Sequence, residues 1–189
     1  MTQPAAFRSP LRVPLRVLGI DPGLTRCGYA VLESSSSRAI TTLALGVLRT
    51  PPSAPLPQRL AELRGELALL NAEYRPHAVA VEQVFFQVNV RTAMSVGQAS
   101  GLALAEAAAA GCDVVQYTPN QVKNAVAGWG GADKAQVQKM VQARLGLVSV
   151  PEPPDAADAA ALALCHIAMA PMAAKVVAGV AAAAAAAQR

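Results

Sequence analysis

Four acidic residues stand at the ends of apolar segments that lie far apart in the chain. Asp21 ends an apolar run and precedes a Pro-Gly turn, and Glu82 ends the apolar run Ala78–Val81. Asp155 and Asp158 open a long apolar segment, and residues three apart on a helix lie on one face. An acid that ends a buried strand needs a partner, because an isolated buried charge is costly. These acids are therefore the first candidates for chemistry.

A common site for the four acids follows if the helix that Asp155 opens packs at the sheet edge where both strands stop. Four carboxylates so close together repel each other unless cations neutralise them. Ligands that are all oxygen select Mg²⁺ or Mn²⁺ over softer metals. Two such ions, about 3.5–4 Å apart, can activate a water and stabilise the leaving oxygen of a phosphodiester. The set of four thus indicates metal-dependent phosphodiester hydrolysis.

Each acid also has an ordinary structural explanation when it is taken alone. Asp21 can simply begin a turn. Asp155 follows Pro154 and can cap the helix or complement its dipole. The remaining helical glutamates are expected to be solvated; they are Glu62, Glu66, Glu73 and Glu106. The informative feature is the set of four rather than any one member.

Basic and aromatic side chains follow the acidic positions along the chain. Lys134 lies at a predicted helix start, where the dipole disfavours a cation unless an anion such as phosphate is present. Lys123 follows the strand that holds Tyr117. The alternative explanation for both lysines is that they are ordinary surface residues. Phe85 and Phe86, two of only three phenylalanines, have the alternative of buried packing.

The elements that must position these side chains begin with three successive strands, predicted at Val17–Ile20, Gly28–Leu32 and Ile40–Arg49. Helices and strands then alternate, with further strands at 78–81 and 114–117 and helices at 58–74, 92–110, 121–127, 133–145 and 155–170. This order predicts an α/β protein with a mixed sheet that carries helices on both faces.

Composition places the chain among single-domain proteins with a sizeable core, since it has 189 residues of which 53% are hydrophobic. The net charge of +4 and the pI near 9.3 suit a nucleic-acid partner without requiring one. Three cysteines, an odd number without metal-ligand spacing, are expected to be free thiols in a reducing cytoplasm.

The two ends of the chain differ from its middle. Residues 1–15 predict a disordered basic extension, residues 16–172 the folded domain, and residues 173–189 a low-complexity alanine-rich tail. The apolar stretch 159–187 is long enough for a membrane span, but His166, Pro171 and Lys175 interrupt it and alanine supplies little hydrophobicity. The sequence therefore predicts a cytoplasmic protein that does not enter a membrane.

Two further groups of residues have less specific interpretations. Gly97 and Gly101 lie four apart on a helix and permit close approach, either to the protein's own sheet or to a second subunit. His77 is expected to be structural. His166 is too far along its helix from Asp155 to join a metal cluster at the helix start.

The chain resembles RuvC, the family of bacterial Holliday junction resolvases. The resemblance runs from about Arg16 to Met169 in order and with suitable spacing. It is carried by the segments Gly19–Tyr29, Val81–Phe85, Gly97–Gly101, Gln121–Lys123, Asp133–Val137 and Asp155–Ala159. The extension before Arg16 and the alanine tail depart from the family pattern.

The resemblance implies an RNase H-like fold with a five-stranded mixed sheet whose first three strands are antiparallel. It implies a homodimer that nicks two strands of a four-way DNA junction symmetrically, leaving 5′-phosphate and 3′-hydroxyl ends. Two Mg²⁺ or Mn²⁺ ions per site would be held by Asp21, Glu82, Asp155 and Asp158. The branch-migration proteins RuvA and RuvB are implied partners.

The same resemblance gives roles to other residues near these acids. Lys123 and Lys134 would contact the scissile phosphate or steady developing charge. Phe85, more than Phe86, would wedge against bases unstacked at the junction. Arg91, with Asn89 beside it, would grip the DNA backbone.

Three other functions compete with junction resolution. The run Asp21–Thr25 fits the phosphate loop of actin-type and sugar-kinase-type proteins, but those need two such domains and this chain is too short. A related RNase H-like nuclease that acts on ribosomal RNA precursors is a second alternative. A junction-binding protein without catalysis is the third.

Overall fold

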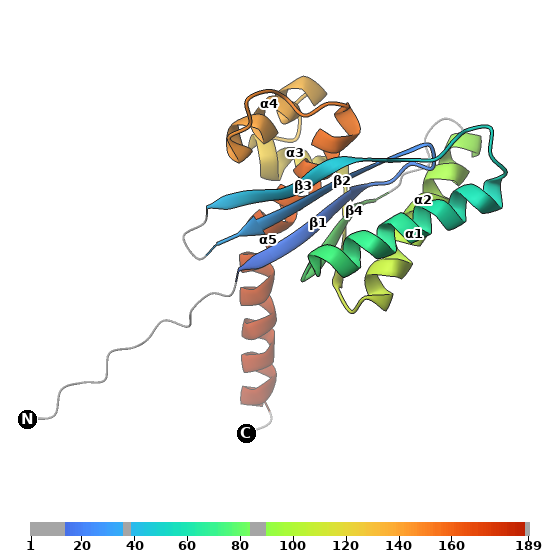
Figure 1. The fold of residues 1–189 in the computed structure, drawn as a ribbon. Coiled ribbons are helices and arrows are strands. Elements are labelled where there is room, and N and C mark those ends of the chain that lie inside the picture. The colour runs from blue at the N-terminus through green and yellow to red at the C-terminus, as the bar shows by residue number, and fades with distance from the viewer. Residues whose placement is uncertain (1–13, 36–38, 84–89, 188–189) are drawn as a thin grey trace, which may run out of the picture.

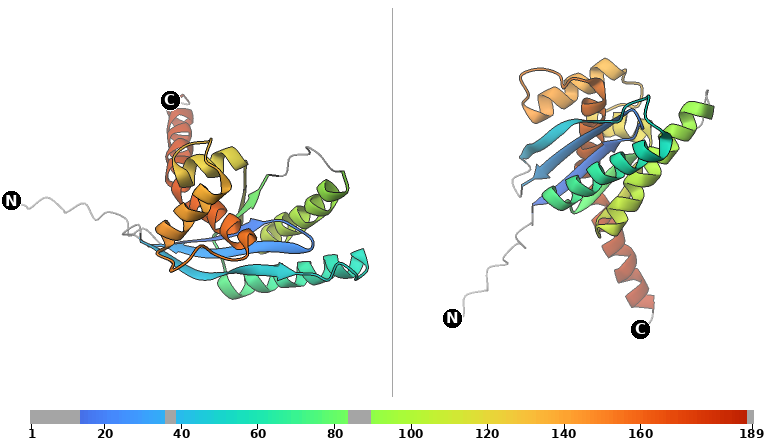
Figure 2. Two further views of the ribbon diagram at one scale, coloured as in Figure 1. Left: turned by 90° about the horizontal axis from the view of Figure 1, so that it is seen from above. Right: turned by 45° about the vertical axis from the view of Figure 1, so that its right-hand side comes forward.

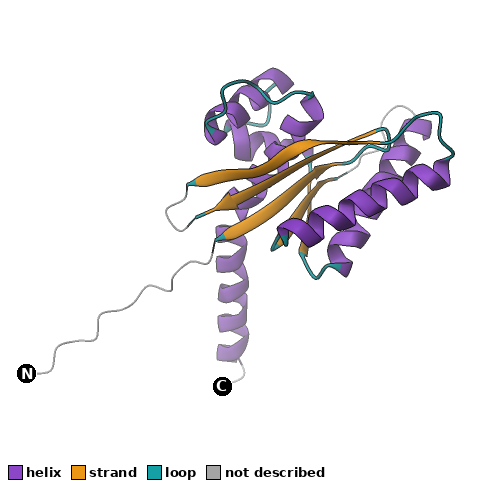
Figure 3. Ribbon diagram, viewed as in Figure 1, coloured by secondary structure: helices purple, strands orange, loops and turns teal. Residues whose placement is uncertain are grey.

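The computed structural model describes residues 14–35, 39–83 and 90–187, with side chains over the same ranges except at 90, 91 and 171–187. Its centre is one five-stranded sheet in the order β3-β2-β1-β4-β5 (Figures 1 and 3). The strands are β1 (Leu15–Asp21), β2 (Arg26–Ser34), β3 (Ile40–Arg49), β4 (Ala78–Glu82) and β5 (Asp113–Tyr117). β1, β2 and β3 pair antiparallel, whereas β4 is parallel to both β1 and β5. The predicted mixed sheet is confirmed.

Five helices are present in the described part of the chain: α1 (Leu56–Tyr74), α2 (Val90–Ala109), α3 (Pro119–Ala127), α4 (Lys134–Leu145) and α5 (Pro154–Ala187). α1 and α2 cover one face of the sheet, and α3, α4 and the first half of α5 cover the other (Figure 2). Alternation along β1 serves both layers, because Val17 packs with α5 and Leu18 packs with α1. The prediction of helices on both faces is also confirmed.

Helix boundaries differ from the predicted ones for identifiable reasons. α1 begins two residues early, at Leu56, because Pro57 fits the first turn, where its missing N–H is not needed. α3 begins at Pro119, after a capping box made by Thr118 and Gln121. α5, predicted to end near Ala170, continues to Ala187, in keeping with the high helix propensity of alanine. The second half of α5 extends away from the sheet (Figure 1).

α5 lies against the sheet at a distance that only glycine permits. A Cβ atom on Gly19 of β1 would lie 2.1 Å from the carbonyl oxygen of Ala159, and one on Gly28 of β2 would lie 2.0 Å from that of Asp155. The facing side of α5 is itself made of small residues, including the fully buried Ala156 and Ala163. Backbone therefore packs directly on backbone, and the start of α5 is fixed relative to the ends of the strands.

The histidines and cysteines occupy structural positions. The backbone N–H of Arg16 donates to His77 Nδ1 over 3.0 Å, and the Tyr117 hydroxyl and His166 Nδ1 are hydrogen-bonded over 2.9 Å. Burial lowers the pKa of His166. All three cysteines are free thiols, as predicted. In the described part of the chain, no helix combines the length and the hydropathy needed to cross a membrane.

The contact between α5 and the sheet gives a stability prediction. Replacing Gly19 with Ala forces α5 away from β1 and should lower the free energy of unfolding by about 3 kcal/mol. Gly65→Ala is the matched control, because a Cβ there meets no other atom within 4 Å. That control should stabilise α1 by about 0.5–1 kcal/mol. Urea denaturation measures both, and equal effects of the two substitutions would contradict the packing argument.

Candidate active site

Asp21 and Glu82 leave the sheet at the same edge. β1 and β4 are parallel neighbours, and Ile20 pairs with Val81 in their register. The next residue of each strand is the acid, so the two carboxylates emerge side by side at the carboxyl ends of the strands. The pattern of an apolar run closed by an acid is therefore a consequence of two parallel strands that stop at one level.

α5 brings the other two acids to this edge. Gly28, which contacts the backbone of Asp155, is the antiparallel partner of Asp21. Asp155 lies in the first turn of α5, and Asp158 follows one turn later. The glycine contact thus sets the start of the helix beside the end of β1.

A cavity of about 220 Å³ opens at this point. Its charged lining consists of the acids Asp21, Glu82 and Asp158 and the lysines Lys123 and Lys134. The remaining wall is mostly apolar and comes from α3, α4 and α5. Three of the four predicted acids and both predicted lysines therefore lie around one hollow.

The fourth acid, Asp155, lies beside this cavity rather than in its lining. Its carboxylate accepts a hydrogen bond from Arg26 Nη2 and forms an ion pair with it. Lys134 Nζ makes the equivalent pair with Asp158 Oδ2 over 2.6 Å. Two of the acids are thus held by protein cations. Arg26 was not among the predicted site residues, although its place just after the Asp21 turn, on the strand paired with β1, is a usable signal.

The pKa of Asp21 reflects both its burial and the acids around it. The pKa of Asp21 is raised from 3.8 to about 7, chiefly by burial and then by the charges of Glu82, Asp158 and Asp155. Burial, followed by the charge of Asp158, also raises the pKa of Glu82. Lys134 opposes both shifts but does not cancel them. The site therefore holds more negative charge than its own cations neutralise.

The donor set suits a hard divalent cation, because it offers carboxylate oxygens in excess of nearby positive charge. With the side chains as they stand, no three His, Cys, Asp or Glu among the described residues converge tightly enough to hold an ion. Arg26 and Lys134 draw two of the carboxylates to themselves. The composition of the site fits a metal, and its geometry is that of carboxylates paired with protein cations.

The other predicted site residues cannot all be placed. Phe85, Phe86 and Asn89 lie outside the described residues, and Arg91 lies in α2 with a side chain that is also outside them. Among the glutamates expected to be solvated, Glu106 departs from the prediction. It is largely buried and pairs with Arg64 over 2.6 Å, which joins α2 to α1.

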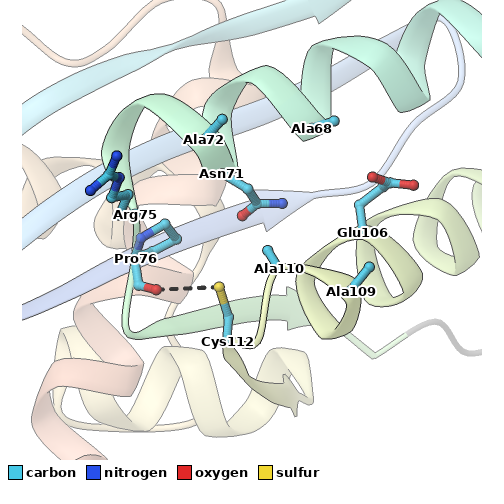
Figure 4. Close-up of a pocket in the computed structure, with 9 residues that line it drawn as sticks. All are labelled: Ala68, Asn71, Ala72, Arg75, Pro76, Glu106, Ala109, Ala110 and Cys112. Carbon is cyan, nitrogen blue, oxygen red and sulfur yellow. Dashed lines mark hydrogen bonds between the residues drawn. The ribbon is translucent and has the colours of Figure 1, made fainter.

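A larger cavity, of about 600 Å³, lies between α1 and α2 on the other face of the sheet (Figure 4). It has one acid, Glu106, which is already paired with Arg64. The thiol of Cys112 donates to the carbonyl oxygen of Pro76 over 3.2 Å (Figure 4). This larger cavity has no cluster of acids, so the smaller cavity is the better candidate for an active site.

Solved structures similar to this chain share its architecture. Thermus thermophilus RuvC aligns with a TM-score of 0.77 at 39% identity and covers 84% of this chain and 97% of its own. The structure of T. thermophilus RuvC in complex with Holliday junction substrate aligns with a TM-score of 0.76 at 37% identity, covering 84% and 96%. The yeast mitochondrial Holliday junction resolvase Ydc2, at 16% identity and a TM-score of 0.63, shares the fold.

Sequence comparison gives the same result. The family model described as crossover junction endodeoxyribonuclease RuvC matches residues 17–166. The protein of that name from Salinispora arenicola is 54% identical over 143 residues, which are 76% of this chain and 82% of the relative. The one from Corynebacterium jeikeium is 48% identical over 140 residues, or 74% and 86%. The chain therefore belongs to the RuvC family of crossover junction endodeoxyribonucleases.

Proposed function

We propose that this chain resolves four-way DNA junctions in recombination and repair by hydrolysing one phosphodiester in each of two symmetry-related strands. The observation that carries the proposal is the cavity lined by Asp21, Glu82, Asp158, Lys123 and Lys134, with Asp155 adjacent. The family membership and the similar structure solved with a Holliday junction substrate support the choice of DNA substrate. They do not favour the alternative of an RNA-processing nuclease.

The four acids are the proposed ligands of two Mg²⁺ or Mn²⁺ ions. Bound ions would supply an activated water and stabilise the leaving oxygen, giving 5′-phosphate and 3′-hydroxyl ends. The protein's own contribution is to hold the acids on two strand ends and one helix start. Lys123 and Lys134 line the same hollow, so their ammonium groups can contact the non-bridging oxygens of a phosphate that enters it.

The segment after β4 is the proposed junction contact. Phe85, with Phe86 as the second choice, would wedge against unstacked bases, and Asn89 and Arg91 would contact the DNA backbone. Their support is their position in the sequence, since the first three lie between Glu82 at the cavity and the start of α2, and Arg91 lies in the first turn of that helix. The division into an extension at 1–15, a nuclease domain at 16–172 and a tail at 173–189 is part of the same proposal.

A homodimer is the proposed assembly, because a two-fold junction must be cut at two symmetry-related phosphates. α2 supports it with an open face of small residues. A Cβ atom on Gly97 or on Gly101 would meet no other atom within 4 Å, and Met94 on the same helix is 60% exposed. We also propose RuvA and RuvB as partners and the cytoplasm as the location. Both proposals rest on the family membership and on the DNA substrate.

Removal of one acid should separate catalysis from binding. Asp21→Asn keeps the shape of the side chain but removes a carboxylate, so junction cleavage should fall by at least about 100-fold. Junction affinity should stay nearly unchanged, because phosphate contacts from the lysines remain. A labelled four-way junction, assayed for cleavage in Mg²⁺ and for binding without it, measures both. Glu62→Gln on the exposed face of α1 is the control, and near-normal turnover by Asp21→Asn would contradict the assigned role.

The raised pKa of Asp21 gives a stability prediction for the protein in a chelator. Between pH 3.8 and about pH 7, Asp21 keeps its proton in the folded state but has lost it in the unfolded state. Stability should therefore fall as pH rises through that window. Asp21→Asn removes this cost and should stabilise the metal-free protein at pH 8 by on the order of 1–3 kcal/mol. Denaturant unfolding at pH 5 and pH 8 measures the difference, and a variant less stable than wild type at pH 8 would contradict the crowding of the acids.

The proposed dimer face can be tested by charge. Gly101→Glu would place an acid on the open face of α2 in both subunits and should shift the protein from dimer to monomer. Gly65→Glu on α1, which is equally free of contacts, is the matched control and should leave the dimer intact. Sedimentation velocity reports the masses. A dimer that survives Gly101→Glu and not Gly65→Glu would move the interface to α1.

A further inference from the structure

Trp129 is the chain's single tryptophan, and it is 55% exposed. It lies in the glycine-rich connection between α3 and α4. Tryptophan is usually buried over most of its surface, because its ring carries a large apolar area. An indole held in solvent beside an active-site helix therefore needs an explanation.

The position of the ring is set by the backbone beneath it. A Cβ atom on Gly131 would lie 2.3 Å from Trp129 Cζ3 and 2.7 Å from Cε3. The six-membered ring therefore rests directly on the main chain at residue 131, where any larger residue would displace it. The indole is thus held in place while more than half of its surface stays open.

The loop that carries Trp129 folds back to the acidic cavity. A Cβ atom on Gly130 would lie 2.5 Å from Asn120 Oδ1 and 3.4 Å from Asn124 Nδ2, so the loop packs along the start of α3. Pro119, next to Asn120, lines the cavity. At its other end the loop leads to Lys134, which also lines it. The middle of the loop therefore packs beside one residue at the rim of the site, and its C-terminal end leads directly into another.

The side chains against Gly130, the residue next to Trp129, are polar, which favours a nucleic acid as the partner. Asn120 and Asn124 are exposed and carry amide donors and acceptors, and Lys123 between them faces the cavity. Aromatic rings, amides and lysines are the groups that bind unpaired nucleotides by stacking, hydrogen bonds and charge.

We propose that Trp129 stacks on a base exposed at the branch point of the junction whose scissile strand enters the acidic cavity, with Asn120 and Asn124 beside that nucleotide. The inference rests on the proposed function, because it needs junction DNA at this site. A continuous duplex keeps its bases stacked on each other and offers no free face to the ring. Trp129 is therefore a contact for the branch point rather than for DNA in general.

Intrinsic fluorescence tests the contact directly, since every tryptophan signal comes from residue 129. The full-length Asp21→Asn protein is titrated with a four-way junction and with a duplex of equal length. Stacking should quench the emission with the junction and leave it nearly unchanged with the duplex. An emission that does not respond to a bound junction would overturn the proposal.

Substitution supplies the second measurement. In the Asp21→Asn background, Trp129→Ala should weaken junction affinity by about 5- to 150-fold, the range expected for loss of one stacked base. Trp129→Phe should keep most of the affinity, and Gly131→Val should lose part of it by displacing the ring. A thermal melt checks that each variant is folded, and duplex affinity should not change. Equal weakening for junction and duplex would overturn the stacking assignment.

Cleavage by otherwise wild-type protein separates this inference from the function on which it rests. If the wild type does not cut four-way junctions, the proposed function fails. If the wild type cuts them and Trp129→Ala cuts them with the same kcat/KM, the function stands and the role of Trp129 is refuted. A lower kcat/KM for junctions with Trp129→Ala, restored by Trp129→Phe, is the expected result.

Discussion

The direct packing of α5 on Gly19 and Gly28 is the contact on which the site depends. Two strand ends place Asp21 and Glu82 together, but the other acids belong to a helix more than 70 residues further along the chain. That helix reaches the same edge because no side chain separates its backbone from β1 and β2. The alanines of α5 contribute little hydrophobicity, but their small side chains allow the helix backbone to approach β1 and β2 closely.

The same packing leads to an electrostatic cost. Burial, and then the charges of the neighbouring carboxylates, raise the pKa of Asp21 to about 7, and Arg26 and Lys134 offset only part of the negative charge. Gathered carboxylates repel one another and destabilise the fold, whereas a site that binds divalent cations needs several of them.

The sequence is most informative where a residue type conflicts with its surroundings. An acid at the end of Ala78–Val81 is costly to bury without a partner, so Glu82, taken together with the other three acids, predicts the sheet edge at which the site lies. The helices follow from apolar spacing and proline punctuation. The end of α5 does not, because repeated alanine is compatible with both a helix and a disordered tail.

Pairings between distant charges are beyond sequence reasoning. Arg26 with Asp155 and Arg64 with Glu106 depend on which helices and strands lie side by side, and neither pair has a local pattern. Trp129 escapes prediction for a related reason, since a lone aromatic residue in a glycine-rich loop belongs to no periodic pattern. Its significance comes from its exposure and from the contact with Gly131.

The most direct test of the gathered acids is a crystal structure of the wild-type protein soaked with Mn²⁺ and measured for anomalous scattering. The account predicts anomalous density between the carboxylates of Asp21, Glu82 and Asp158, with Lys134 withdrawn from Asp158. Density at another place, with the pair of Lys134 and Asp158 intact and the cavity free of Mn²⁺, would contradict it.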